Sequence, residues 1–198
     1  MNQLLKDCSM FELVRKNRNF RNFWYGQLIS QLGDRIHTLA VIWLVYSWYN
    51  SGAAVGAVLI AATLPAFLVS PFAGNILDKY DRKKILLISD VVRSVFVAGL
   101  AILSFFEMVN LPIILFFTVI ISIGAAFFNP ATMAIMPSLV KKEELTQANA
   151  FYQLSINASA ALGFMVGSGL IALIGVTAAF SINAVSFLLS AFFVFKIV

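Results

Sequence analysis

Six apolar segments dominate this sequence and limit the folds that it can adopt. They cover residues 23–49, 53–77, 85–106, 112–136, 146–174 and 176–195. A helix of at least about 18 apolar residues can cross the roughly 30 Å hydrocarbon core of a bilayer, with tilt where the segment is longer. Strands of a membrane barrel are about ten residues long and alternate between apolar and polar side chains, and these segments do neither. The sequence therefore predicts an all-α, polytopic membrane protein with six transmembrane helices.

The composition agrees with a membrane protein. Hydrophobic residues make up 61% of the 198 residues and charged residues only 12%, whereas a soluble domain has about 25% charged residues. The basic N-terminal stretch precedes an apolar run that is too long for a signal peptide. We therefore expect a cytoplasmic N-terminal arm at 1–22 and a transmembrane bundle at 23–198.

Charge and rare residue types argue against several classes of function. The net charge of +5 could indicate nucleic-acid binding, but the basic residues flank membrane segments, where topology explains them better. Cys8 is the only cysteine and His37 the only histidine, so neither a disulfide within the chain nor a clustered metal site is expected. No constellation of paired carboxylates or of serine with histidine indicates an intramembrane enzyme. We expect no cofactor, no metal and no nucleic-acid partner.

The loops between the segments predict an orientation in the membrane. The loops at 50–52, 107–111 and 175 contain no lysine or arginine. The lysines and arginines outside the segments lie in the N-terminal arm, at 78–84, at 141–144 and at Lys196. Because cytoplasmic loops of membrane proteins carry an excess of these residues, both termini are predicted to face the cytoplasm. The expected location is the inner (plasma) membrane, with its lipids around the bundle.

Polar residues form a stripe along the first segment. Gln27, Gln31, Asp34 and Thr38 fall at i, i+4, i+7 and i+11, which places them on one face of a helix. Asp34 and Arg35 lie roughly 20 Å from the cytoplasmic end. Because adjacent helix residues point about 100° apart, at least one of these two needs a partner elsewhere. Two interpretations stay open: an internally neutralised helix in a bundle, or a water-filled pathway in which Asp34 exchanges a proton or meets a cationic substrate.

A second polar stripe lies on the fifth segment. Asn149, Gln153 and Asn157 repeat at i, i+4 and i+8. These uncharged groups could offer hydrogen bonds in the same pathway. His37 is expected to be a packing residue rather than a proton relay, because nothing near it in sequence pairs with it.

The third segment carries a charge pair. Asp90 and Arg93 stand at i, i+3, a spacing that lets the two side chains pair on one surface. The pair could brace the bundle, or it could be a latch that exchanges partners with Asp78 or Arg82 as the protein changes state.

Prolines predict irregular helices. Pro65 and Pro71 are expected to kink the second segment. In the fourth segment, Asn129-Pro130 predicts a break, and Pro137 followed by the charges at 141–144 predicts the end of the helix.

A dense cluster of charges at 74–84 separates the second and third segments. Its sequence resembles the loop signature G-x-L-a-D-R-x-G-R-K of the major facilitator superfamily of transporters. Gly74, Asp78, Arg82 and Lys83 match this signature, whereas Asp81 stands where the family usually has glycine.

Further motifs resemble the drug:proton antiporter branch of this superfamily, which includes macrolide-efflux and siderophore-export permeases. The resemblance covers roughly residues 20 to 195. Its motifs are Gly33-Asp34, Asn129-Pro130-Ala131, Pro137-Ser138-Leu139-Val140 and Gln147-Ala148-Asn149-Ala150. Two features depart from the pattern: Ile120 replaces an arginine found in some exporters, and the element at 163–168 lacks a proline and a final glycine.

The resemblance implies the N-terminal six-helix half of a transporter that works by rocking two halves around a central substrate. We expect proton-coupled efflux of amphipathic small molecules such as drugs or siderophores. The expected proton and substrate residues are Asp34, Arg35, Gln27, Gln31, Thr38, Asn149, Gln153 and Asn157. The expected cytoplasmic gate consists of Gly74, Asp78, Arg82, Lys83, Asp90 and Arg93.

The expected partners are the small-molecule substrate, protons and a second six-helix half. The chain ends at Phe195-Lys196-Ile197-Val198, where the sixth segment reaches the cytoplasm, which favours a truncated or isolated half that pairs with a C-terminal half or with another copy. The alternative function is an assembly module that joins such a partner and transports nothing by itself.

Overall fold

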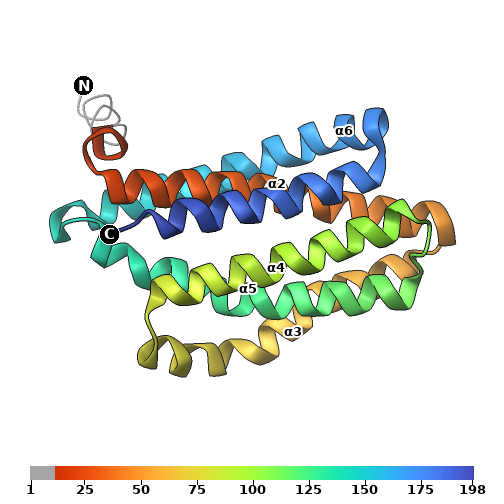
Figure 1. The fold of residues 1–198 in the computed structure, drawn as a ribbon, viewed down its shortest axis with the longest axis horizontal. Helices are drawn as coiled ribbons and strands as arrows, with labels where there is room; N and C mark the ends of the chain where they lie inside the picture. The colour runs from red at the N-terminus through yellow and green to blue at the C-terminus, as the bar shows by residue number, and fades with distance from the viewer. Residues whose placement is uncertain (1–11) are drawn as a thin grey trace.

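A computed structural model describes residues 12–198, and this part of the chain is almost entirely helical (Figure 1). Lys6 and Cys8 of the N-terminal arm lie outside the described residues. The helices are α2 (Arg18–Tyr49), α3 (Gly52–Lys79), α4 (Arg82–Phe105), α5 (Leu111–Leu139), the short 3-10 helix η1 (Lys142–Glu144) and α6 (Leu145–Phe195). No strand occurs in the described range, so the all-α prediction is confirmed.

Side chains in the short loops cap these helices. Asn17 accepts a hydrogen bond from the backbone N–H of Phe20 at the start of α2, and Ser51 and Asn110 do the same three residues on in α3 and α5. Asn50 ends α2 in the left-handed conformation, with φ of 43°. Such caps satisfy backbone groups that the helix leaves without partners. They explain why the chain reverses in so few residues between the apolar segments.

The helix α6 changes direction at Gly175. This residue has φ of 82° and ψ of 173°, a conformation that a residue with a Cβ rarely adopts, and it separates two helical stretches. Figure 1 shows the chain turning back at this point, so the second stretch runs antiparallel to the first. The predicted boundary at residue 175 is confirmed.

Four helical stretches are long and apolar enough to cross a membrane in the described part of the chain. They are Gly52–Lys79, Arg82–Phe105, Leu111–Leu139 and the continuous stretch Lys142–Phe195. The helix α2 is long enough to cross a membrane, but its polar stripe lowers its mean hydropathy. The stretch Lys142–Phe195 is counted as one span, although Gly175 divides it into two helical stretches. The chain is therefore a polytopic all-α membrane protein, while the predicted number of six spans exceeds the four that length and composition identify.

The prolines lie inside continuous helices, and α3 runs without a break through Pro65 and Pro71. The helix α5 runs without a break through Pro130 and ends at Leu139, two residues beyond Pro137. The expected break at Asn129-Pro130 is therefore wrong. A proline inside a membrane helix is tolerated where neighbouring groups satisfy the freed backbone. Pro130 removes the N–H that would bond to the Ala126 carbonyl, and the helix continues past it.

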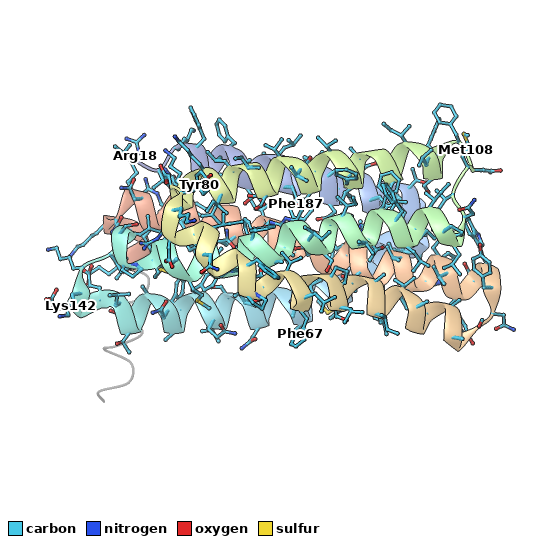
Figure 2. All side chains as sticks on the ribbon, turned by 90° about the horizontal axis from the view of Figure 1, so that it is seen from below. Arg18, Phe67, Tyr80, Met108, Lys142 and Phe187 are labelled. Carbon is cyan, nitrogen blue, oxygen red and sulfur yellow. The ribbon has the colours of Figure 1, made fainter. Side chains whose placement is uncertain are left out.

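The helices pack as two groups that meet along α4. The helix α2 lies against both stretches of α6, α3 lies against α5, and α4 contacts α5 and α6 (Figure 1). Figure 2 shows Arg18, Tyr80 and Lys142 at one end of the bundle, which we call the basic end, and Met108 at the other. Two hydrophobic clusters fill the interior, one towards each end. The polar and charged residues described next lie between them.

Candidate functional site

A cavity of about 440 Å³ opens between α2, α3, α4, α5 and the first stretch of α6. Its wall combines five titratable or charged side chains with hydroxyl and amide groups. The lining residues include Gln31, Asp34, Arg35, His37, Thr38, Arg93, Thr118, Ser122, Asn129, Thr132 and Tyr152. Ligand pockets usually measure about 300–1,000 Å³, so the volume suits a small molecule.

Arg93 joins two carboxylates from different helices. Its Nη2 donates to Asp90 Oδ1 on the same helix at 2.6 Å, and its Nη1 lies 3.5 Å from Asp34 Oδ2 on α2. The predicted pairing of Asp90 with Arg93 is confirmed, and Asp34 has the distant partner that its position required. The side chain of Asp90 is fully buried, whereas that of Asp34 is 30% exposed. Asp34 is therefore the carboxylate that faces the cavity.

Two aromatic rings hold the Arg93 guanidinium. Its carbon lies 4.0 Å from the ring centroid of Phe128 on α5 and 4.2 Å from that of Phe187 on α6. A cation over an aromatic face is stabilised by the ring quadrupole, most strongly away from water. Gly124 leaves room for the stem of the arginine, because a Cβ there would lie 2.8 Å from Arg93 Cγ. The position of the guanidinium is thus determined by three helices besides its own.

Arg35 differs from Arg93 in having no counter-ion. It lines the cavity, and its Cβ would lie 2.6 Å from a Cβ placed on Gly163 of α6, so glycine allows this close approach. No carboxylate of residues 12–198 lies within salt-bridge distance of its guanidinium, and its buried Nε has no hydrogen-bond partner there. The structure thus contains one shared guanidinium and one unpaired guanidinium in the same cavity wall.

The predicted stripe on α2 divides between cavity and core. Gln31, Asp34 and Thr38 line the cavity, and the Thr38 hydroxyl donates to the backbone carbonyl of Asp34 at 2.8 Å. Gln27 is buried one turn further towards the basic end, where its Oε1 accepts a hydrogen bond of 3.2 Å from the Tyr152 hydroxyl. Gln27 therefore joins α2 to α6 rather than lining the cavity.

The second predicted stripe lies outside the cavity. Asn149, Gln153 and Asn157 are exposed on the first stretch of α6. Their neighbour Tyr152 points the other way, into the core and the cavity wall. The structure therefore does not bring the two stripes together within this chain.

His37 is buried at the edge of the cavity. Its ring packs against Phe180 on the second stretch of α6, with centroids 5.1 Å apart. Its Nδ1 and the hydroxyl of Thr118 on α5 are buried without hydrogen-bond partners among the described residues. The contact with Phe180 agrees with the predicted packing role of His37. The sequence did not predict that His37 lies beside a cavity.

Ser122 connects α5 to the backbone of α3 beside Pro65. Its hydroxyl donates to the Ala62 carbonyl at 2.8 Å and accepts from the Ala66 N–H at 3.2 Å. These two backbone groups would bond to each other in a regular helix. Both groups lie beside Pro65, so a side chain from a neighbouring helix satisfies the backbone that the proline disturbs.

The charged cluster at 74–84 forms a shorter loop than the sequence predicted. The helix α3 continues to Lys79 and α4 begins at Arg82, so only Tyr80 and Asp81 connect them. Asp81 caps α4 by accepting a hydrogen bond of 2.8 Å from the Lys83 N–H. This capping role explains how aspartate can replace the glycine that the family usually has at this position.

The predicted gate residues fall into two separate groups. Arg82 donates to the Ala134 carbonyl on α5 at 3.0 Å, and Lys83 Nζ donates to the Ile197 carbonyl, both at the basic end. Gly74 and Asp78 are exposed there. Asp90 and Arg93 instead belong to the cavity with Asp34, because two turns of α4 carry them away from the loop. The predicted gate that joins this pair to the loop residues stays a prediction.

The sequence did not indicate the aromatic residues of the site. Phe128 and Phe187 are two of 19 phenylalanines, and no spacing in the sequence distinguishes them from residues that face lipid. Figure 2 shows Phe187 within the bundle and Phe67 on its outer surface. Thr118, Thr132 and Tyr152 were missed for the same reason, since single polar residues in long apolar helices carry no pattern.

The fold and this cavity define a class of protein: a polytopic helical membrane protein with charged residues around an internal cavity. The chain belongs to the transmembrane secretion effector family of the major facilitator superfamily, whose family model matches residues 11–197. The members of this superfamily are transporters, which agrees with the expectation that the chain is not an enzyme.

Curated relatives include named exporters. The chain is 32% identical to the putative bacilysin exporter BacE of Bacillus subtilis over 181 residues, 90% of this chain and 44% of that protein. It is 29% identical to macrolide efflux protein A of Streptococcus pyogenes over 68% of this chain and 33% of that protein. It is 26% identical to the staphyloferrin A transporter of Staphylococcus aureus over 85% of this chain and 43% of that protein. The chain thus spans less than half the length of these relatives.

Proposed function

We propose that the chain is the N-terminal half of a proton-coupled secondary transporter that exports amphipathic small molecules. The names of its relatives support the direction of transport and a small-molecule substrate, because they describe export of bacilysin and efflux of macrolides. The volume and mixed lining of the cavity support a small-molecule substrate. The complete transporter resides in the plasma membrane.

The observation that carries this proposal is the shared guanidinium. Two carboxylates, Asp34 and Asp90, compete for the single charge of Arg93, so the cluster has a net charge of −1 when both are ionised. A proton on Asp34 cancels that excess and weakens the attraction between α2 and α4. Asp34 is the accessible member, while Asp90 remains bound to Arg93 at 2.6 Å. Protonation can therefore change the attraction between two helices that line the cavity.

We further propose six membrane spans with both termini in the cytoplasm. Figure 2 shows Arg18, Tyr80 and Lys142 at the basic end, and Arg82 and Lys83 follow Tyr80 at the start of α4. In the described part of the chain, the loops at 50–52, 107–111 and 175 contain no lysine or arginine. This distribution supports a cytoplasmic basic end. The reversal of α6 at Gly175 supports counting its two stretches as two spans.

The proposed partner is a second six-helix half. Asn149, Gln153 and Asn157 are exposed on a helix whose surroundings are otherwise apolar, and polar groups facing lipid are unfavourable. A second half over this face would complete the cavity with these amides. The contacts of Arg82 and Lys83 support a gate at the basic end, where Gly74 and Asp78 would meet that half.

The test is efflux by the complete transporter with Asp34→Asn. Everted vesicles are energised with a pH gradient, and movement of a panel of amphipathic fluorescent dyes is recorded. The variant is expected to lose gradient-driven efflux while its melting temperature stays near that of wild type, because asparagine keeps the size of the side chain. Glu143→Gln, which removes an exposed carboxylate, is the matched control. Efflux by Asp34→Asn at the wild-type rate would make Asp34 a structural residue.

A second candidate function is an assembly module that transports nothing itself. The chain aligns with only 44% of the bacilysin exporter, and this partial coverage supports the alternative of an assembly module. Vesicles that contain this chain alone separate the two cases, because a transport-competent homodimer moves dye and an assembly module does not.

A further inference from the structure

Arg35 is a charged residue far from both ends of its helix. It lies midway along the 32-residue helix α2, roughly 25 Å from the start of the helix at 1.5 Å per residue. Charged residues at such depth in a membrane protein nearly always pair with a group of opposite charge or face a functional cavity. Arg35 lines the cavity and pairs with no carboxylate of the described chain.

The nearby carboxylates are already engaged. Asp34 precedes Arg35 in sequence but points towards Arg93, whose Nη1 lies 3.5 Å from it. Asp90 is buried against the same guanidinium. A cationic substrate would therefore compete with Arg93 for these two groups, whereas an anionic group at Arg35 would break no salt bridge of the described residues.

The stem of the Arg35 side chain packs closely against α6, and no salt bridge holds its guanidinium. Its Cβ and Cγ press against Gly163 of α6, where any larger residue would displace them. Its Nε is buried and has no hydrogen-bond partner in residues 12–198. A guanidinium held in this way presents a planar fork of donors, which matches the two oxygens of a carboxylate.

Other polar groups without hydrogen-bond partners line the same cavity. The Thr118 hydroxyl and His37 Nδ1 are buried without partners among the described residues, and both residues line the cavity. Groups that are buried without partners are rare in proteins and call for a ligand or water. These two groups can form hydrogen bonds to a ligand whose charged group binds Arg35.

We propose that Arg35 is the recognition site for a carboxylate of the transported molecule. The substrate class is then a small amphipathic acid or zwitterion with further hydrogen-bonding groups. This inference rests on the proposed transport function, and it adds the charge of the substrate to it.

Equilibrium binding tests the inference without requiring transport. The complete transporter in nanodiscs at pH 7 is titrated with dansyl-alanine, whose carboxylate is ionised, and with dansyl-alaninamide, which has the same shape without the charge. Dansyl fluorescence reports the dissociation constants. Wild type is expected to prefer the acid by about 10- to 100-fold, the range for a charge-assisted hydrogen-bonded pair.

Two variants and a control identify the responsible group. Arg35→Gln is expected to abolish the preference by weakening acid binding while amide binding changes less than about threefold. Arg35→Lys keeps the charge without the planar fork, so it is expected to restore part of the preference. Arg15→Gln, which removes an exposed arginine, is expected to leave both dissociation constants unchanged.

Three results would overturn the inference. The first is a wild type that binds neither probe or does not prefer the acid. The second is Arg35→Gln that keeps the full preference. The third is a lower melting temperature of Arg35→Gln together with an unchanged preference for the acid. That result would mean that Arg35 pairs with a carboxylate of the second half and not with the substrate. Loss of gradient-driven dye efflux in wild type would refute the transport function alone, and the Arg35-dependent preference would still be measured.

Discussion

Replacing Arg93 tests whether the charge cluster stabilises the bundle. Arg93→Gln removes the only cation between Asp34, at 3.5 Å, and the fully buried Asp90, at 2.6 Å. Glutamine can still reach one carboxylate as a donor, but it leaves the negative charges without a counter-ion. The measured quantity is the free energy of unfolding of the complete transporter in detergent.

The expected loss follows from the burial of the pair. Removing one partner of a buried ion pair costs about 3–5 kcal/mol, because the remaining charge stays buried. The rings of Phe128 and Phe187 lose a cation at 4.0 and 4.2 Å, a contact worth up to about 2 kcal/mol for a desolvated pair. These contributions overlap and do not add. We therefore expect a loss of about 4 kcal/mol.

Thermal unfolding followed by intrinsic fluorescence measures this loss. At about 2–4 °C for each kcal/mol, the melting temperature is expected to fall by roughly 8–16 °C. The double variant Asp90→Asn with Arg93→Gln removes the uncompensated buried charge and is expected to recover about half of the loss. A loss below about 1 kcal/mol, or a double variant no more stable than Arg93→Gln alone, would refute the proposed electrostatic role of the cluster.

Two smaller predictions concern other contacts. Ser122→Ala removes both hydrogen bonds to the backbone of α3 beside Pro65 and is expected to cost about 1–3 kcal/mol in melting experiments, whereas an unchanged melting temperature would show that water replaces these hydrogen bonds. Lys16 holds the pKa of the exposed Glu12 carboxyl below its ordinary value through a hydrogen bond and its charge, so this pair favours the folded state above the ordinary pKa and loses that effect as pH falls through the lowered one. Lys16→Gln is expected to raise the pKa of Glu12 in an NMR titration, with little effect on stability, and an unchanged pKa would show that the contact does not persist in solution.

The helical framework could be predicted from the sequence because hydropathy and capping act locally. The apolar runs end within a few residues of the observed helices, and Gly175 separates the two stretches of α6 as expected. The prediction failed at Pro130, where the helix continues. Whether a proline breaks a helix depends on groups of neighbouring helices, and these are not visible in a local pattern.

The candidate site could be predicted only in part. The i, i+3 spacing indicated the pair of Asp90 and Arg93, and the angle between neighbouring helix residues required a distant partner for Asp34. The identity of that partner depends on how α2 packs against α4, which no local pattern records. Whether Arg35 has a counter-ion depends on the tertiary structure, because Asp34 and Asp90 both contact Arg93.

The most direct test of the account is proton movement driven by substrate. Proteoliposomes with the complete transporter, a pH-sensitive dye inside and no initial pH gradient receive an outward gradient of a transported dye. The account predicts that wild type moves protons inward as the dye leaves, and that Asp34→Asn moves none. Proton movement of equal size through Asp34→Asn, or dye export by wild type without any proton movement, would contradict it.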